Sequence, residues 1–232
     1  MWQALREELR PEGVEVVTVA LDVGGAEAAG PWIDAARPRH PALIDADHRL
    51  VELLGIWNVP MGVWIDEAGG LVRPPEVAHP GTSVLRDMMV EHGIPPDAPE
   101  LLLEILSETA KIRVKPERYA EALRDWAAHG AESRFALAPE EVVERSRPRD
   151  VRASSAAAHF ELGQFLFRDG EQGAARAHFR EAHRLDPGNW SYKRQAWSFE
   201  NELQGPSEHY DSDWLRDVRA FGPENYYPLP DL

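Results

Sequence analysis

The sequence contains no cysteine among its 232 residues. A thiolate is the nucleophile of disulfide exchange, and no other side chain replaces it in that reaction. The chain as written therefore has no residue for thiol–disulfide chemistry. The absence of cysteine does not by itself indicate the redox compartment in which the protein works.

Long apolar runs and an excess of basic residues are also lacking. No apolar run approaches the roughly 20 residues of a membrane-spanning helix. The first ten residues lack the basic opening, apolar stretch and small-residue cleavage site of a signal peptide. Asp and Glu number 40 against 25 Lys and Arg, a formal net charge of -15, which argues against binding to nucleic acid or an anionic membrane. We therefore expect a cytoplasmic protein with an acidic, self-repelling surface.

Familiar catalytic and metal-binding patterns are missing as well. No serine stands in a Gly-x-Ser-x-Gly elbow, no His-Glu-x-x-His is present, and Gly24-Gly25 lacks the Lys-Ser/Thr of a phosphate loop. His178 and His183 are five residues apart, a poor spacing for one helix face. Asp45 and Asp47 are more typical of a turn and a helix N-cap than of an acid pair. We expect no catalytic residue, no metal site and no cofactor.

Hydrophobic periodicity predicts alternating helices and strands in the first part of the chain. The segment 14–22 is nearly continuous in apolar and β-branched residues, which is typical of a strand buried on both faces of a parallel sheet. In the helix predicted over 47–55, we expect Leu50, Leu53 and Leu54 to face inward and Gly55 to end the helix. The predicted elements are helices over 2–10, 26–37, 47–55 and 82–92, and strands or extended segments over 14–22, 41–45, 63–66 and 71–72.

Only helical patterns follow residue 97. Helices are predicted over 101–112, 116–129 and 139–146, and a longer helical block over 154–203. The tail 205–232 is rich in Pro, Asp and aromatic residues and has weak periodicity. Its aromatic residues, with those just before them, form either a binding surface or a staple that holds the tail on the helices, and the staple is the more common use.

The first part of the chain resembles the redoxin branch of the thioredoxin-like superfamily. The resemblance rests on the order of elements and on the stretches 14–22, 41–45, Val59-Pro60 and 63–72. It implies a cis peptide bond at Val59-Pro60, with the backbone of Val59 offered to a substrate peptide. The alternative is an ordinary trans peptide bond that enters an edge strand. Met88 and Met89, with Val84 and Leu85, would form the apolar side of the helix over 82–92.

The family's cysteine motif and the strand before it have no counterpart here, because the resemblance matches the start of this chain to the helix that follows them. In the family, that strand lies between the strands matching 14–21 and 63–66. Without it, buried backbone groups would be left unpaired at about 1–3 kcal/mol each. One explanation is that Met1 is an internal methionine of a longer protein. The other is a shortened protein in which another chain or a rearranged segment fills the gap.

The second half carries positions that match the spacing of one tetratricopeptide repeat. Small residues would let two antiparallel helices approach, larger ones would fill the space between them, Gly170 would permit the turn and Pro187 would end the second helix. The matching positions are Leu162, Gly163, Leu166, Gly170, Ala175, Phe179, Ala182 and Pro187. Only one repeat is visible, whereas stable arrays need about three. Of a peptide-binding groove and a hairpin packed on its neighbours, the single repeat favours the hairpin.

Together these patterns predict a thioredoxin-like α/β domain, incomplete at its start, followed by an all-α tetratricopeptide-like domain. The expected divisions are 1–95 for the α/β domain, 96–150 for a helical connector, 151–204 for the hairpin and its capping helix, and 205–232 for the aromatic tail. Two functions remain open. The first is a redoxin-family protein, related to thiol-disulfide oxidoreductases and peroxide reductases, that is redox-inactive as written. The second is a non-catalytic module that binds a protein or peptide. The sequence does not indicate an oligomeric state.

Overall fold

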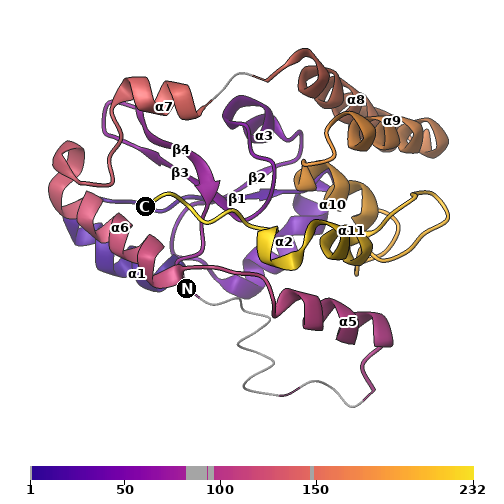
Figure 1. Ribbon diagram of the computed structural model, residues 1–232, viewed down its shortest axis with the longest axis horizontal. Helices are drawn as coiled ribbons and strands as arrows, with labels where there is room; N and C mark the ends of the chain where they lie inside the picture. Colours follow the sequence, from indigo (N-terminus) through magenta and orange to yellow (C-terminus); the bar gives the residue numbers. More distant parts are fainter. Residues whose placement is uncertain (1, 82–92, 94–96, 147–148) are drawn as a thin grey trace.

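The computed structural model describes residues 2–81, 93, 97–146 and 149–232. These residues contain helices and strands in a mixed α/β arrangement (Figure 1). The elements are α1 (Trp2–Leu9), β1 (Thr18–Leu21), α2 (Gly25–Ala36), β2 (Ala42–Asp45), α3 (Arg49–Leu54), β3 (Met61–Ile65), β4 (Leu71–Val77), α5 (Glu100–Thr109), α6 (Pro116–His129), α7 (Pro139–Arg145), α8 (Val151–Arg168), α9 (Gln172–Leu185), α10 (Trp190–Ser198) and α11 (Trp214–Phe221). The predicted order of an α/β part followed by helices is confirmed at this level. The helix expected over 82–92 lies outside the described residues.

The strands form two separate sheets of two strands each. β1 and β2 are parallel, with Val19 opposite Leu43, and β3 and β4 are antiparallel, with Met61 opposite Val77. Among the described residues, no ladder joins β1 to β3. One edge of each strand therefore has no strand partner in this part of the chain.

Two local predictions are wrong. The strand expected over 14–22 is only the four residues of β1, and it is half-buried rather than enclosed on both faces. A two-stranded ladder is too narrow to be covered as a wide parallel sheet is. In α3, Leu53 is 77% exposed and Val51 is the buried residue. A helix of six residues has fewer than two turns, so apolar spacing alone does not fix which side chain meets the core.

The tail is more regular than its sequence suggests, because it contains α11. The Asp213 side chain caps this helix by accepting a hydrogen bond from the backbone N–H of Arg216. The aromatic residues of the last fifth of the chain are mostly buried in one cluster, which confirms the predicted staple. The buried ones are Trp190, Tyr192, Trp197, Tyr210, Trp214 and Tyr226.

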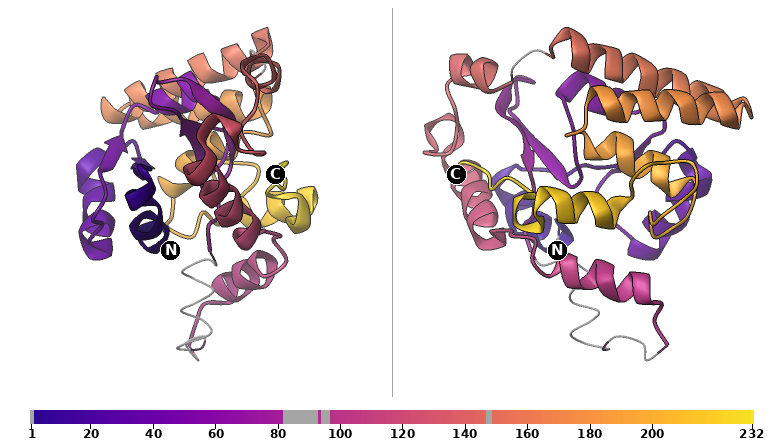
Figure 2. Two further views of the ribbon diagram at one scale, coloured as in Figure 1. Left: turned by 90° about the vertical axis from the view of Figure 1, so that its left-hand side faces the viewer. Right: turned by 45° about the vertical axis from the view of Figure 1, so that its right-hand side comes forward.

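Two hydrophobic clusters form the core. In the larger one, Val51 and Ile56 join the buried faces of α8, α9 and α10. In the smaller one, α1, β3 and α6 meet around Trp64, whose indole N–H donates a 3.1 Å hydrogen bond to the hydroxyl of Tyr119. Each cluster combines residues from before and after residue 96. The α8–α9 pair runs along one side of the molecule (Figure 2).

Candidate interaction sites

The Val59-Pro60 peptide bond, which leads directly into β3, is cis, as the resemblance implies. Its surroundings differ from an open edge. The hydroxyl of Tyr227 donates a 2.7 Å hydrogen bond to the carbonyl oxygen of Val59. The backbone of Val59, which the resemblance offers to a substrate peptide, is therefore bonded through its oxygen to the tail of the same chain.

Neighbouring carbonyl groups are also bonded from within the chain. The backbone N–H of Ser191 donates to the carbonyl of Trp57 at 3.0 Å, and that of Ala78 donates to the carbonyl of Pro60 at 3.1 Å. Between them, Asn58 is fully buried. Its Oδ1 accepts from the backbone N–H of Val59 at 2.8 Å. The segment around the cis bond is thus closed on the side of α10 and the tail.

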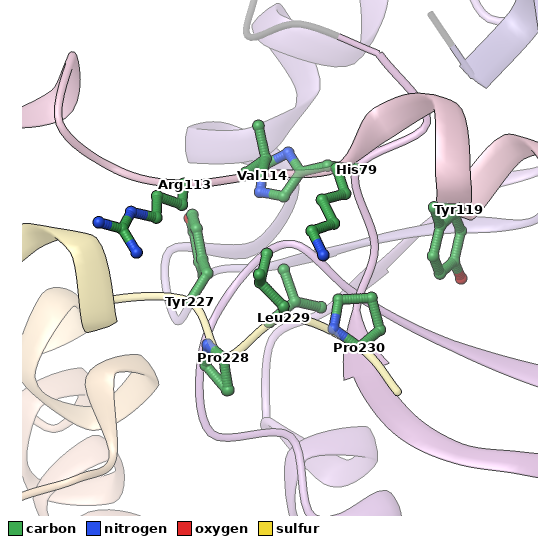
Figure 3. Close-up of a pocket in the computed structure, with 10 residues that line it drawn as sticks. His79, Arg113, Val114, Tyr119, Tyr227, Pro228, Leu229 and Pro230 are labelled. Carbon is green, nitrogen blue, oxygen red and sulfur yellow. The ribbon is translucent and has the colours of Figure 1, made fainter. Parts of the chain in front are cut away.

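A small pocket lies beneath the tail where it crosses His79 and Val114 (Figure 3). Its free space is about 10 Å³, which is room for one water molecule. Nε2 of His79 is buried without a hydrogen-bond partner among the described residues, and burial lowers the pKa of this imidazole. The His79 ring meets that of Tyr227 edge-on at 4.9 Å.

Arginines hold the last residues of the tail. Arg73 of β4 is 2% exposed and donates to the Glu76 carboxylate at 2.7 Å and to the carbonyl oxygens of Phe135 and Asp231, also at 2.7 Å each. Burial raises the pKa of Glu76, although the hydrogen bond from Arg73 opposes that change. Arg118 of α6 donates to the carbonyl oxygen of Leu232 at 2.6 Å. The tail is therefore bound largely through its backbone.

The helical hairpin predicted from the repeat pattern is present as α8 and α9. Gly163 lies against Phe179, and Ala175 and Ala182 are fully buried. Gly170 adopts a φ of +87° in the turn, a conformation that side chains with a Cβ rarely adopt. Pro187 follows the end of α9, and Leu166 packs against the larger core cluster. These positions take the structural roles that their spacing predicts.

Leu162 does not. It was expected to fill the space between the helices, but it is 42% exposed. Phe160 fills that space instead: it is 1% exposed and stacks on Tyr192 at 4.2 Å between ring centroids. The missed signal is the helical spacing of Ala156, Phe160, Gly163 and Phe167, which places these residues on one face.

Four apolar residues of α8 face outward. Val151, Ala158, Leu162 and Phe165 are exposed and are separated by seven, four and three residues, so they share one face of the helix. We call these four residues the α8 stripe. It lies opposite the face that buries Phe160. Ser154 and Ser155 lie on this face between Val151 and Ala158, so the apolar residues are neighbours only from Ala158 to Phe165. Single exposed apolar residues are ordinary, but neighbouring ones on one face are typical of an interaction surface.

The histidines form one pair that their spacing in the sequence does not reveal. Nδ1 of His178 lies 2.8 Å from Nδ1 of His159 across the hairpin, whereas His183 points into the core. Burial, with a smaller effect of the nearby Lys193 ammonium, lowers the pKa of His183 to about 4. No group of three or more His, Cys, Asp or Glu residues suited to a metal ion occurs in the described part of the chain.

No protein-family model, no curated protein and no solved structure matches this chain. Among the described helices, none has both the length and the apolar character needed to span a membrane.

Proposed function

We propose that this chain is a non-catalytic protein-interaction module and that the α8–α9 hairpin is its binding part. The observation that supports this proposal is the α8 stripe, which leaves an apolar row exposed along the outward face of an 18-residue helix. The absence of cysteine and the internal bonding of the Val59 carbonyl argue in the same direction, because the chain has no thiol and the carbonyl beside the cis bond is already bonded to Tyr227.

The partner that fits this surface is an amphipathic helix of another protein. The backbone groups of α8 are bonded within the helix, so an extended peptide would find no ladder to join. Apolar side chains spaced by three and four residues instead form ridges and grooves for a second helix. Ala158, in the middle of the α8 stripe, lets the axis of that helix come close.

The test places a photo-crosslinking amino acid at position 162 and, as a control, at exposed Ala177 of α9. We expect a defined cross-linked species from position 162 only, lost in the variant Phe165→Ser and kept in Glu161→Gln. Equal cross-linking from both positions, or cross-linking that survives Phe165→Ser, would contradict the proposal. Analytical ultracentrifugation of the wild-type chain distinguishes a partner that is a second copy of this chain from one that is a different protein. Dimers whose population rises with concentration would show that the partner is a second copy.

A second candidate is the redoxin-related role that the resemblance implies. It is favoured by the two separate sheets, in which β1 and β3 each lack a partner strand along one edge within the described residues. The chain should show no turnover in insulin-disulfide reduction or peroxide consumption. Activity gained when the in-frame sequence encoded upstream of Met1 is added would favour this candidate over the interaction module.

A further inference from the structure

The segment 227–232 lies across the protein as a bound peptide would. It contains neither helix nor strand and passes over β4, α6 and residues 113–115 (Figures 1 and 3). Arg73 and Arg118 bond its backbone carbonyl oxygens at positions 231 and 232. Contacts of this kind recognise an extended backbone and depend little on the side chains of the bound segment.

Basic side chains surround this segment in an otherwise acidic protein. The only acidic side chain of the segment is Asp231, whose Oδ2 lies 3.3 Å from Nη1 of Arg145. Arg113 and Lys115 are exposed, line the pocket under Pro228–Pro230, and form no ion pair within the described residues. Arg113 and Lys115 therefore lie beside Leu229, an apolar residue of the tail that cannot pair with them.

The fit of the tail is also incomplete in its apolar contacts. A water-sized space remains beneath it, the imidazole of His79 keeps a buried nitrogen without a partner, and Leu229 is partly exposed. Segments held by few buried contacts open locally at a lower free energy than the core. Local opening of the tail alone would uncover the surface beneath it without global unfolding.

We propose that the surface beneath residues 227–232 is a docking site for an extended, acidic, proline-containing segment of a partner protein. The tail is its intramolecular occupant and the partner displaces it. Prolines fix an extended backbone before binding and so reduce its entropic cost. An acidic residue in the position of Leu229 would pair with Arg113 and Lys115. This site lies apart from the α8 stripe and does not depend on the proposed function.

The test uses the full-length chain and two labelled, amidated peptides, Tyr-Tyr-Pro-Leu-Pro-Asp-Leu and the same peptide with Glu in place of the first Leu. Three chains are compared by fluorescence anisotropy. These are the wild type, a tail-weakened variant (Pro228→Gly, Leu229→Ser, Pro230→Gly), and that variant with Arg113→Gln and Lys115→Gln. Because the tail competes, the apparent Kd equals the intrinsic Kd divided by the fraction of chains in which the tail is open. We expect at least about tenfold tighter binding of the Glu peptide after tail weakening.

The charge substitutions should then reduce the affinity for the Glu peptide to that for the Leu peptide, and added salt should do the same. Circular dichroism verifies that each variant is folded. Tyr227→Phe, which removes only the hydrogen bond to Val59, should tighten binding in the same direction by a smaller factor. Equal binding of a scrambled Glu peptide, or no gain in either tail variant, would overturn the proposal. The variant Phe165→Ser should leave peptide binding unchanged.

Discussion

A β-carbon added at Gly163 would lie 2.7 Å from Cδ1 and Cε1 of Phe179. The Phe179 ring cannot easily retreat, because it is buried and lies within 6 Å of the rings of both Phe160 and Phe199. The close approach of α8 and α9 therefore depends on the missing side chain at this position.

Gly163→Ala should consequently lower the free energy of unfolding by about 1–3 kcal/mol, the usual cost of overpacking a core. A loss of stability would be informative, because helix propensity alone favours alanine over glycine by about 1 kcal/mol and so predicts a gain. Gly173→Ala is the matched control, since a β-carbon there meets nothing within 4 Å. It should stabilise the chain slightly. Urea unfolding followed by circular dichroism measures both, and equal effects at the two glycines would contradict the packing argument.

The hairpin was predictable because its determinants are local. The close approach of α8 and α9 requires small residues at Gly163 and Ala182, and the turn between the helices requires Gly170. The spacing of these residues is visible in the sequence. The misassignment of Leu162 has a physical cause too. A residue next to Gly163 is turned by about 100° around the helix, and only the neighbouring elements decide which side is inward. Here the inward side is the one that carries Phe160 and meets Tyr192.

The tail site was not predictable in the same way. Tyr227 and Val59 are 168 residues apart, and so nothing in the local pattern links them. Arg73 lies between Val72 and Pro74 in β4, and two of its hydrogen-bond acceptors, the carbonyl oxygens of Phe135 and Asp231, come from distant segments. The sequence indicated an aromatic staple, but the surface that receives it is formed only by the fold.

Helix α8 contains one buried phenylalanine, Phe160, and one exposed phenylalanine, Phe165. Phe160→Ala should cost about 3–5 kcal/mol, because the side chain is fully buried among other rings. Phe165→Ala should cost less than about 1 kcal/mol, since the ring is 58% exposed. Thermal and urea unfolding of the two variants give the comparison. A large loss in Phe165→Ala would mean that the α8 stripe is covered within the chain rather than available to a partner.

Arg73→Met should destabilise the chain by about 3–5 kcal/mol, because it leaves the largely buried Glu76 carboxylate without its cation and two carbonyl oxygens without a donor. Adding Glu76→Gln should restore part of the loss by removing the isolated charge. Arg134→Gln provides the surface control, as the Arg134–Glu121 pair is exposed and should contribute under about 1 kcal/mol. Chemical unfolding at pH 7 tests the series. The buried-pair explanation requires that the double variant be more stable than Arg73→Met alone. A double variant that is no more stable would reject this explanation.

Stability should fall as the pH falls from about 6.5 to about 4, and His183 should account for a large share of the change. In the folded chain the pKa of this imidazole is about 4, so it stays neutral down to that pH. In the unfolded chain it takes up a proton below about 6.5. The unfolded state therefore binds more protons across this window, and the free energy of unfolding decreases as the pH is lowered. The full effect is roughly 3 kcal/mol.

The variant His183→Phe keeps a ring between Trp197 and Tyr210 but cannot titrate. Urea unfolding at pH 7 and pH 4.5 should show the wild type losing about 2–3 kcal/mol more than the variant. The variant should keep some pH dependence, because burial also lowers the pKa of His48, which lies 2.8 Å from the amide of Gln164. If the two chains lose the same stability between pH 7 and pH 4.5, then His183 takes up its proton in the folded state as readily as in the unfolded state, and the prediction is wrong.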